Sequence, residues 1–446
     1  MKPCWGDWGV YVIDEFEKGF GQSLELMQTR LEGYYDFKTA IEDMIDGRQP
    51  DPHSATPALC AALFDYAAKT VPHRVEDDQG RANVFNPHRE TRIGARPSSI
   101  PKQGRDVFRD ILEGDEETGH ALIADFDQET SMPPDDLFHG LLETRRVVDQ
   151  EAHAVAVVNK FPSYVRVMDD KLYALLEHIG FVSRRRFQRG KLATLRTIPR
   201  GVNLVTFPFS YVESLSNMPV FDLYSVVLAT QRALRATRSS GRVPNCPYDV
   251  FFNIKELAGG TLPRIHMQAY VRTWIDPLEH YDLNAEGQAS MQEWSDNEIT
   301  RLECDNRSWW ACVPPVRSGR FDIRLELKNE KWKEFVDLRE IELWDLAEML
   351  VYHSNVLDNY ADIPARNVQF FPTGVVIRPF AVDGGHEKIR QERIYAHPSR
   401  VFAEQYNNIV VPVGKSILYR QPEDARGRET FHRLVDANSP ILRRAA

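Results

Sequence analysis

Three features that could act together on a phosphate group lie within one stretch of sixteen residues: Asn253, the small-residue run Gly259-Gly260-Thr261, and the sequence His266-Met267-Gln268. A neutral histidine can attack phosphorus as a nucleophile, and amide or backbone N–H groups can donate hydrogen bonds to phosphate oxygens. In type, these residues suffice to hold a phosphate and to attack it. Whether they can act together depends on the strands and turns that position them.

The region 248–275 predicts a strand, a tight turn and a second strand. Apolar, β-branched and aromatic residues flank the glycine pair on both sides, which is the pattern of two strands with a break between them. Because Gly259 and Gly260 have no Cβ, backbone N–H groups there can come close to an anion. Thr261 adds a hydroxyl donor.

The second strand of this region separates polar from apolar side chains. Side chains alternate between the two faces of a strand. The alternation therefore puts Arg264, His266 and Gln268 on one face and Ile265, Met267 and Ala269 on the other. Taken alone, the fragment also fits an ordinary hairpin whose polar face meets solvent and whose histidine has no special role.

The whole stretch resembles the nucleophile region of the histidine-triad superfamily, and specifically its galactose-1-phosphate uridylyltransferase branch. The active-site strand of that branch reads HPHxQ, where this chain has Arg264-Ile265-His266-Met267-Gln268. In the family an Asn lies thirteen residues before the nucleophilic His, and a Gly-x-Ser turn begins seven residues before it. Those places hold Asn253 and Gly259-Gly260-Thr261 here.

The resemblance extends from about Asn83 to Thr273. The segment 155–165 resembles the family's strand and Asn-rich turn that hold the nucleoside, which makes Asn159 the matching position. The transferases often continue with Asp where this chain has Lys160, so the preference for a base or sugar stays open. The segment 85–101 resembles the opening segment of the family, in which an Arg before Pro contacts phosphate; Arg96 is the counterpart.

The chain departs from the family at the structural zinc site. Zinc-containing members use a Cys-x-x-Cys pair, a separate His and the first His of HPH, and Arg264 occupies that last place. The five cysteines, Cys4, Cys60, Cys246, Cys304 and Cys312, form no Cys-x-x-Cys. Zn²⁺ in structural sites needs about four N or S ligands, so we expect neither a zinc site nor another cofactor.

Arg264 has three interpretations at this stage. Its guanidinium could pair with a carboxylate that remains where the metal was, contact the substrate phosphate in a bidentate manner, or form an ordinary ion pair at a strand edge. The motif alone does not choose among them.

The residue types define the expected chemistry. His266 can present the lone pair of Nε2 if a backbone carbonyl holds its Nδ1–H, and it would then form a covalent nucleotidyl intermediate. The glycine turn, Asn253 and an arginine would stabilise the phosphate oxygens. Gln268 can donate and accept hydrogen bonds but cannot transfer a proton at neutral pH, which favours an acceptor that brings its own phosphate oxygen.

Composition is that of an ordinary globular protein. The chain has 446 residues, of which 42% are hydrophobic and 27% charged, enough for two or three domain-sized cores. We find neither a membrane span nor a signal peptide, and the scattered cysteines indicate a reducing compartment, so we expect a cytoplasmic enzyme. The net charge of -10 argues against nucleic acid as a partner.

The expected fold class is α+β, with two domains of the histidine-triad type in a pseudo-duplicated arrangement. Beyond the linker the order strand, strand, helix, strand resembles the family's degenerate second domain, where Arg324 and Arg378 are among the candidates for an acceptor phosphate. The proposed divisions are a helical N-terminal extension at 1–82, a catalytic domain at 83–275, a linker at 276–301, and the second domain with its C-terminal tail at 302–446.

The resemblance implies a nucleotidyltransferase that moves a nucleoside monophosphate from a nucleotide sugar to a sugar 1-phosphate through His266. A phosphorylase of nucleotide sugars or dinucleoside polyphosphates, which uses inorganic phosphate, is the first alternative. A catalytically inactive nucleotide-binding protein is the second. The implied partners are a nucleotide sugar, a phosphorylated acceptor and a second copy of the chain in a homodimer.

Overall fold

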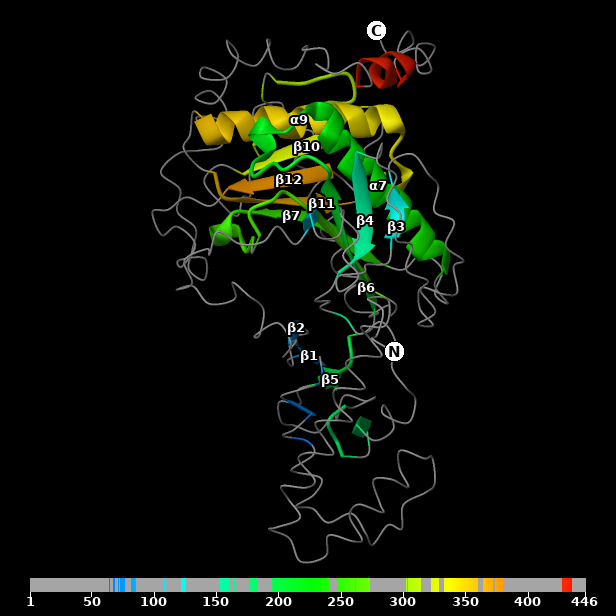
Figure 1. Ribbon diagram of the computed structural model, residues 1–446. Helices are drawn as coiled ribbons and strands as arrows, with labels where there is room; N and C mark the ends of the chain where they lie inside the picture. Colours follow the sequence, from blue (N-terminus) through cyan, green and yellow to red (C-terminus); the bar gives the residue numbers. More distant parts are fainter. Residues whose placement is uncertain are drawn as a thin grey trace, which may run out of the picture.

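The computed structural model of the chain combines helices with antiparallel sheets (Figure 1). The residues that it describes are 64, 67–68, 71, 73–76, 82–85, 108–109, 122–125, 153–159, 164, 176–177, 179–182, 195–199, 201–240, 247–260, 262–272, 302, 304–313, 322–328, 333–359, 364–371, 374–379 and 427–434. Within them the expected α+β class is confirmed.

A sheet of nine strands forms the centre of the described structure. Its strands in spatial order are β3 (Leu122–Asp125), β4 (Ala154–Val158), β6 (Gly201–Pro208), β8 (Met267–Arg272), β7 (Tyr248–Ile254), β11 (Arg366–Phe371), β12 (Gly374–Pro379), β10 (Ile323–Leu327) and β9 (Trp309–Cys312). Neighbouring strands pair antiparallel. The sheet is twisted, so that β4 runs down the view of Figure 1 while β12 and β10 run across it.

The same order of elements occurs twice in this sheet. β4 and β6 are followed by the 3-10 turn η4 (Leu215–Asn217), helix α7 (Val220–Ser240), β7 and β8. β9 and β10 are followed by the 3-10 turn η7 (Phe335–Asp337), helix α9 (Glu340–Asn359), β11 and β12. In each set the spatial order is first, second, fourth and third strand, and the two third strands, β7 and β11, pair with each other.

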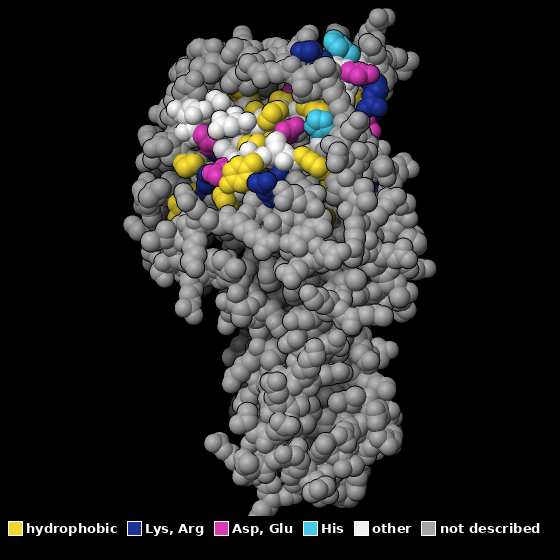
Figure 2. All heavy atoms as spheres, viewed as in Figure 1, with side chains coloured by type: hydrophobic (Ala, Val, Ile, Leu, Met, Phe, Trp, Pro, Cys, Tyr) yellow, Lys and Arg dark blue, Asp and Glu magenta, His cyan; other side chains and the backbone are white. Residues whose placement is uncertain are grey.

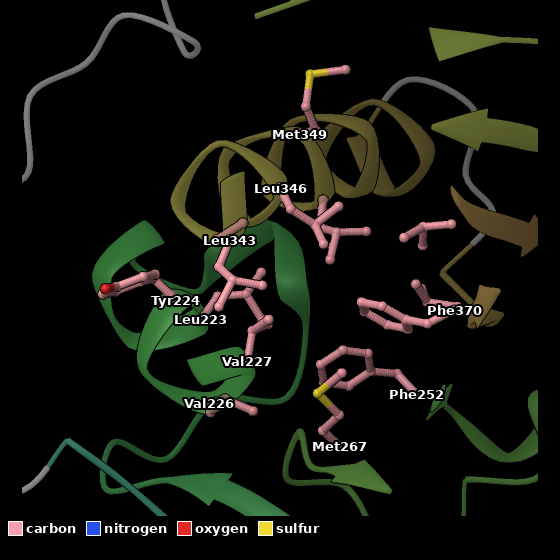
Figure 3. Packing of buried hydrophobic residues seen from close by; sticks show 14 of the residues in the cluster. Leu223, Tyr224, Val226, Val227, Phe252, Met267, Leu343, Leu346, Met349 and Phe370 are labelled. Carbon is pink, nitrogen blue, oxygen red and sulfur yellow. The ribbon is translucent and has the colours of Figure 1, made fainter. Parts of the chain in front are cut away.

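Both long helices cover one face of the sheet and share one hydrophobic core with it. Figure 3 shows Leu343 and Leu346 of α9 and Val227 of α7 pointing into the layer that also receives Phe252 and Met267 from the sheet. These side chains are fully buried. Because burial of a large apolar side chain contributes about 1.5–3 kcal/mol, this shared layer holds the two sets of elements together.

Helix starts follow from local sequence. α7 begins directly after Pro219 and carries Asp222 in its first turn, where a negative charge complements the helix dipole. At the start of α9, the carboxylate of Glu342 accepts a hydrogen bond of 2.7 Å from the backbone N–H of Arg339, which is half of a capping box.

The opposite face of the sheet carries a second, smaller apolar cluster made of Phe108, Val155, Val157, Val205 and Phe207. Alternation along β4 and β6 explains it, because residues next to these in sequence belong to the helix-covered core. We call this second face the site face, since His266 and Gln268 belong to it by the same alternation.

A separate three-stranded sheet contains β2 (Ala82–Phe85), β1 (His73–Glu76) and β5 (Leu195–Thr197). Of the extension at 1–82, which was expected to be mainly helical, the described residues 64 and 67–68 are helical, whereas 73–76 form a strand. The register pairs His73 with Phe85, and their rings stack at 5.3 Å, so tertiary pairing decides the conformation at 73–76. The proposed boundary after residue 82 falls at the first residue of β2. Residues 1–63 and the linker 276–301 lie outside the described residues.

The second set of elements follows the expected order with one addition. The region expected as a single last strand is the hairpin of β11 and β12. Arg324, considered above for an acceptor phosphate, is 2% exposed and forms an ion pair of 2.6 Å with Glu326. Its charge is thus balanced inside the protein.

A buried ion pair braces the 208–218 loop, the segment between β6 and α7. Arg366 of β11 is fully buried and forms an ion pair with Asp358 near the end of α9. The same carboxylate accepts hydrogen bonds from the hydroxyls of Ser214 and Ser216 in the loop. The second set of elements therefore fixes a loop of the first.

We expect Asp358→Ala to lower the free energy of unfolding by about 3–5 kcal/mol, because Arg366 would stay buried without its counter-charge. Denaturant unfolding of the variant and of wild type measures the change. The matched control is Asn359→Ala, at the exposed neighbouring position. Equal midpoints for both variants would contradict this account.

A second polar network lies between α9 and residues 306–308, directly before β9. Glu348 accepts hydrogen bonds from the Trp344 indole at 3.0 Å and from the Asn306 amide at 3.2 Å. Burial, and next the nearby carboxylate of Asp345, raise the pKa of Glu348 to about 8.

On the face seen in Figure 2, charged side chains of both signs lie among hydrophobic ones in the upper part of the molecule, the part that holds α9 in Figure 1.

The raised pKa of Glu348 makes stability depend on pH. The folded state holds this proton more tightly than the unfolded state, so the stabilisation is complete below the ordinary pKa of 4.5 and is lost as pH rises toward about 8. We expect Glu348→Gln, which cannot ionise, to lose less stability over that interval than wild type. Thermal midpoints measured across the interval test this, and identical pH profiles would exclude Glu348 as a source of the dependence.

Candidate active site

His266 lies at the entry to β8 and is 5% exposed. Its Nδ1 is 2.9 Å from the backbone carbonyl oxygen of Arg264. A carbonyl oxygen can only accept, so Nδ1 carries the proton and donates it to this bond. The backbone carbonyl expected for Nδ1 is thus that of Arg264, and the lone pair of a neutral His266 is on Nε2.

Gln268 and Tyr270 continue this chain of hydrogen bonds along the same face of β8. Nε2 of His266 accepts from the Gln268 amide nitrogen at 3.3 Å, and the Tyr270 hydroxyl donates to the Gln268 amide oxygen at 3.2 Å. Since Nε2 is an acceptor, the amide group facing it must be NH₂. The tautomer of His266 therefore fixes which end of the Gln268 amide faces Nε2, and the Tyr270 hydroxyl donates to the amide oxygen at the other end.

Alternation along β8 anchors this chain of hydrogen bonds to the hydrophobic core. Met267, Ala269 and Val271 belong to the helix-covered core, whereas Gln268 and Tyr270 are half-buried on the site face. The ring of Phe108 lies 5.3 Å from that of His266, and Phe108 packs in turn on Phe207 at 4.4 Å. An apolar surface thus lies beside the imidazole of His266.

Asn253 lies near the end of β7 on the site face, and the glycine turn follows this strand. β7 ends at Ile254, the 3-10 turn η5 spans Glu256–Ala258, and Gly259 has a left-handed backbone with φ 81. A Cβ on Gly260 would lie 2.7 Å from the Asn253 carbonyl oxygen, so only glycine fits there. The connection is longer than the expected tight turn, because η5 adds a helical turn to it.

Strain is stored at the start of this turn. Lys255 has φ 67 and ψ 164, a conformation that non-glycine residues rarely adopt and that costs about 1–3 kcal/mol. Its carbonyl oxygen accepts from the backbone N–H groups of Ala258 and Gly260 at 3.2 and 2.9 Å. These two bonds hold the turn in its strained form.

Arg264 joins the segment before β8 to the 208–218 loop. Its Nη2 donates to the carbonyl oxygens of Pro208 at 2.6 Å and Phe209 at 2.7 Å. The backbone N–H of Ile265 donates to the carbonyl oxygen of Val212 at 2.8 Å. Arg264 thus clamps the loop through backbone carbonyl oxygens at the end of β6.

Arg264 stands where zinc-containing members of the resembled family have one of their ligands. A guanidinium cannot ligate Zn²⁺, and Arg264 is committed to two carbonyl oxygens. Within the described ranges, no group of three or more His, Cys, Asp or Glu residues is placed to hold a metal ion.

Asn159 follows β4 and is 7% exposed. Its backbone N–H donates to the carbonyl oxygen of Asn203 at 2.8 Å, and the Asn203 side chain accepts from the backbone N–H of Tyr164. Asn203 pairs with Tyr270 in the sheet register, which places Asn159 at the level of Tyr270. That level lies four residues along β8 from His266, about 13 Å at the usual rise per residue.

The described site therefore contains His266, Gln268, Asn253, Gly259, Gly260, Arg264 and Asn159 on connected strands and turns of one sheet. Arg96, Lys160 and Thr261 lie outside the described residues. Two partners were absent from the expected set: Tyr270, which shares the alternation of His266 and Gln268, and Asn367, whose contact with Asn253 is described below. Among the residues described, no helix has the length and apolar character of a membrane span.

Several solved structures are similar to this chain. An ADP-glucose phosphorylase from Arabidopsis thaliana with bound ADP-glucose is 13% identical, with a TM-score of 0.47, over 73% of this chain and 95% of that chain. A uridylyltransferase is 15% identical, with a TM-score of 0.48, over 76% and 99% of the two chains. A GalT-like protein from Arabidopsis thaliana is 12% identical, with a TM-score of 0.47, over 67% and 91%.

The words uridylyltransferase and GalT-like in these names refer to the branch that the segment 253–268 resembles. No family model matches the chain, and the search of curated proteins finds no match either. At such identities and TM-scores, similarity does not by itself assign an activity to this chain.

We expect ¹⁵N NMR of the ring nitrogens to show His266 protonated on Nδ1 and unprotonated on Nε2 in its neutral form. In Tyr270→Phe the Arg264 carbonyl still holds the proton on Nδ1 while the Gln268 amide loses the donor to its oxygen, so the tautomer should stay the same and the Nε2 signal should shift as its contact with Gln268 loosens.

Tyr248→Phe, the same substitution on β7, is the control and should leave these signals unchanged, because the Tyr248 hydroxyl contacts Glu334. His266→Ala identifies the signals. A wild-type His266 protonated on Nε2 would contradict the assignment.

Proposed function

We propose that the chain is a nucleotidyltransferase that moves a nucleoside monophosphate from a nucleotide sugar to a phosphorylated acceptor through a covalent intermediate on His266. The observation that carries this proposal is the 2.9 Å contact between Nδ1 and the Arg264 carbonyl, which leaves the Nε2 lone pair on the site face. A buried histidine held in this tautomer is suited to attack an electrophilic phosphorus.

The first step forms one bond and breaks one. Nε2 of His266 attacks the α-phosphorus of the nucleotide sugar, the P–N bond forms, and the P–O bond to the leaving sugar 1-phosphate breaks with its electron pair. The imidazole becomes positively charged, and its Nδ1–H stays hydrogen-bonded to the Arg264 carbonyl. No proton has to move, which agrees with Gln268 in a place where an acid is not required.

The second step reverses the first with a different phosphate. An oxygen of the acceptor phosphate attacks the phosphorus, the P–O bond forms, and the electron pair of the P–N bond returns to Nε2. An acceptor that is already a phosphate anion needs no general base. This requirement favours a sugar 1-phosphate or inorganic phosphate over water.

Donors on the site face would stabilise the charge that develops on the phosphate oxygens. The Gln268 NH₂ lies next to Nε2, and the glycine turn follows Asn253 on the neighbouring strand. In phosphoryl transfer such fixed donors, together with positioning, do most of the catalytic work. Gln268 must move aside or share its N–H as the phosphorus approaches. The contact of 3.3 Å between its amide nitrogen and Nε2 of His266 is long for a hydrogen bond, so breaking it costs little free energy.

The nucleoside would extend from the phosphate along β8 toward Asn159. The distance of about 13 Å between their levels along the strand is close to the reach of a nucleoside monophosphate. Tyr270 and Phe251 meet edge to face at 5.0 Å and Tyr164 lies 5.5 Å from Tyr270, which makes this part of the face aromatic. Aromatic rings stack well on bases of any type.

The repeated order of elements supports a pseudo-duplicated fold with one active half. On β12, which has the place of β8 in the second set, the half-buried alternating positions hold Gly374, Val376 and Arg378. None of the three can serve as the nucleophile. The second half would therefore contribute support and part of the acceptor pocket.

The test is intact-mass measurement after incubation with a panel of nucleoside diphosphate sugars. We expect wild type to gain one nucleoside monophosphate group with the correct donor, and His266→Ala to gain none. The matched control is His432→Ala, at an exposed position on the 427–434 helix, which should form the adduct as wild type does.

Addition of labelled sugar 1-phosphate or labelled inorganic phosphate to the adduct separates the transferase from the phosphorylase. Release of the label as a nucleotide sugar supports transfer to a sugar phosphate, and release as a nucleoside diphosphate supports the phosphorylase. No adduct and no exchange with any donor would favour the inactive nucleotide-binding protein.

A further inference from the structure

Asn367 of β11 reaches across the junction of the two sets of elements and contacts the candidate site. It pairs with Asn253 in the register between β11 and β7. Its Nδ2 donates to the Asn253 side-chain oxygen at 2.6 Å and to the carbonyl oxygen of Ala258 at 2.9 Å. One amide group thus holds both Asn253 and the end of η5, directly before the glycine turn.

These contacts fix the orientation of both amides. The Ala258 carbonyl can only accept, so the atom of Asn367 that faces it must be the nitrogen. The atom of Asn253 that lies 2.6 Å from the same nitrogen must then be its oxygen. The NH₂ of Asn253 is therefore left to face away from Asn367, and a Cβ on Gly259 would lie 3.9 Å from it.

We propose that Asn367 is a positioning residue that turns the Asn253 NH₂ toward the transferred phosphate. This inference rests on the proposed function, since it assigns a purpose to the donor that Asn253 presents beside the glycine turn. Asn367 does not touch the phosphate. It acts by occupying the oxygen of Asn253, so that only the donor end of that amide is available.

The same device occurs on the next strand of the sheet. The Tyr270 hydroxyl occupies the oxygen of Gln268, and the Gln268 NH₂ faces Nε2 of His266. The side-chain amides of Asn253 on β7 and Gln268 on β8 are thus each held by a hydrogen bond to their oxygen. Each therefore presents its NH₂ group. Fixed donors that need no reorientation during the reaction are the main source of electrostatic stabilisation in active sites.

Asn367 comes from the half that has no nucleophile of its own. Its neighbour Arg366 points to the other face and braces the 208–218 loop through Asp358. One strand of the second half therefore reaches the first half on both faces of the sheet. The second half would act on the reaction through the orientation of Asn253, with no contact to the substrate required.

The experiment measures the rate of adduct formation on His266 at saturating nucleotide sugar, and the concentration at half saturation. Loss of a whole oxyanion donor costs about 100- to 1,000-fold, so loss of its positioning partner in Asn367→Ala should cost less, on the order of tenfold. Half saturation should change by less than about threefold, because the donor acts on the developing charge. Asn253→Ala should show the larger loss.

Asn367→Asp tests the proposed orientation of the Asn253 amide more directly than Asn367→Ala. Its carboxylate would accept where the native amide donates, so Asn253 would turn its NH₂ toward the carboxylate and its oxygen toward the phosphate. We expect a larger loss of rate than in Asn367→Ala. Gln369→Ala is the control, since Gln369 is the next residue of β11 on the same face and pairs with Phe251; its rate should equal that of wild type.

The double variant Asn253→Ala with Asn367→Ala distinguishes positioning from general structural damage. If Asn367 acts only through Asn253, the double variant should be no slower than Asn253→Ala alone. Additive losses, or an unchanged rate in both Asn367 variants while wild type and Gln369→Ala form the adduct, would overturn the role of Asn367. Absence of an adduct in wild type would overturn the proposed function, and this role with it.

Thermal midpoints of all variants are measured in parallel. If Asn367→Ala does not fold, exchange of the Asn367 side-chain amide protons in wild type and in Asn253→Ala gives a separate readout. Faster exchange of one of the two protons in Asn253→Ala is expected, because its acceptor is removed while the Ala258 carbonyl remains. Equal exchange in both proteins would contradict the proposal.

Discussion

The hydrogen bond from His266 Nδ1 to the Arg264 carbonyl is the contact on which the site depends. It selects the tautomer of the imidazole, and the tautomer decides in turn which end of the Gln268 amide can face it. The carbonyl itself is held in place by its own residue, because the Arg264 guanidinium grips the end of β6. The Arg264 side chain thus positions the site through contacts with backbone carbonyl oxygens, which also accept hydrogen bonds from its buried guanidinium.

Much of this geometry could be predicted from sequence, because it follows from local periodicity. Alternation along a strand places His266 and Gln268 on one face, and apolar residues three and four apart predict α9. The requirement for a carbonyl at Nδ1 follows from the chemistry of imidazole alone. Tyr270 could have been found in the same way, since it is the next residue in the alternation that contains His266 and Gln268.

Other features depend on pairing between distant segments, which local patterns do not encode. Nothing near Asn367 indicates that β11 pairs with β7, more than one hundred residues earlier in the chain. The guanidinium of Arg264 had three plausible partners by type, and only the path of the 208–218 loop shows that it reaches carbonyl oxygens. At 73–76, strand pairing with β2 and β5 determines the conformation of a segment that lies within the extension expected to be mainly helical.

The pairing of β7 with β11 also determines how the chain can fail. A shortened protein that ends before β11 would retain His266 and Gln268, but β7 would present an open row of N–H and C=O groups along Val250–Ile254. Such an edge invites pairing with other chains, and Phe252 on it would lose the ring of Phe370, which lies 6.3 Å away in the intact protein. Pairing with β11 therefore keeps the edge of the first half from becoming a template for aggregation.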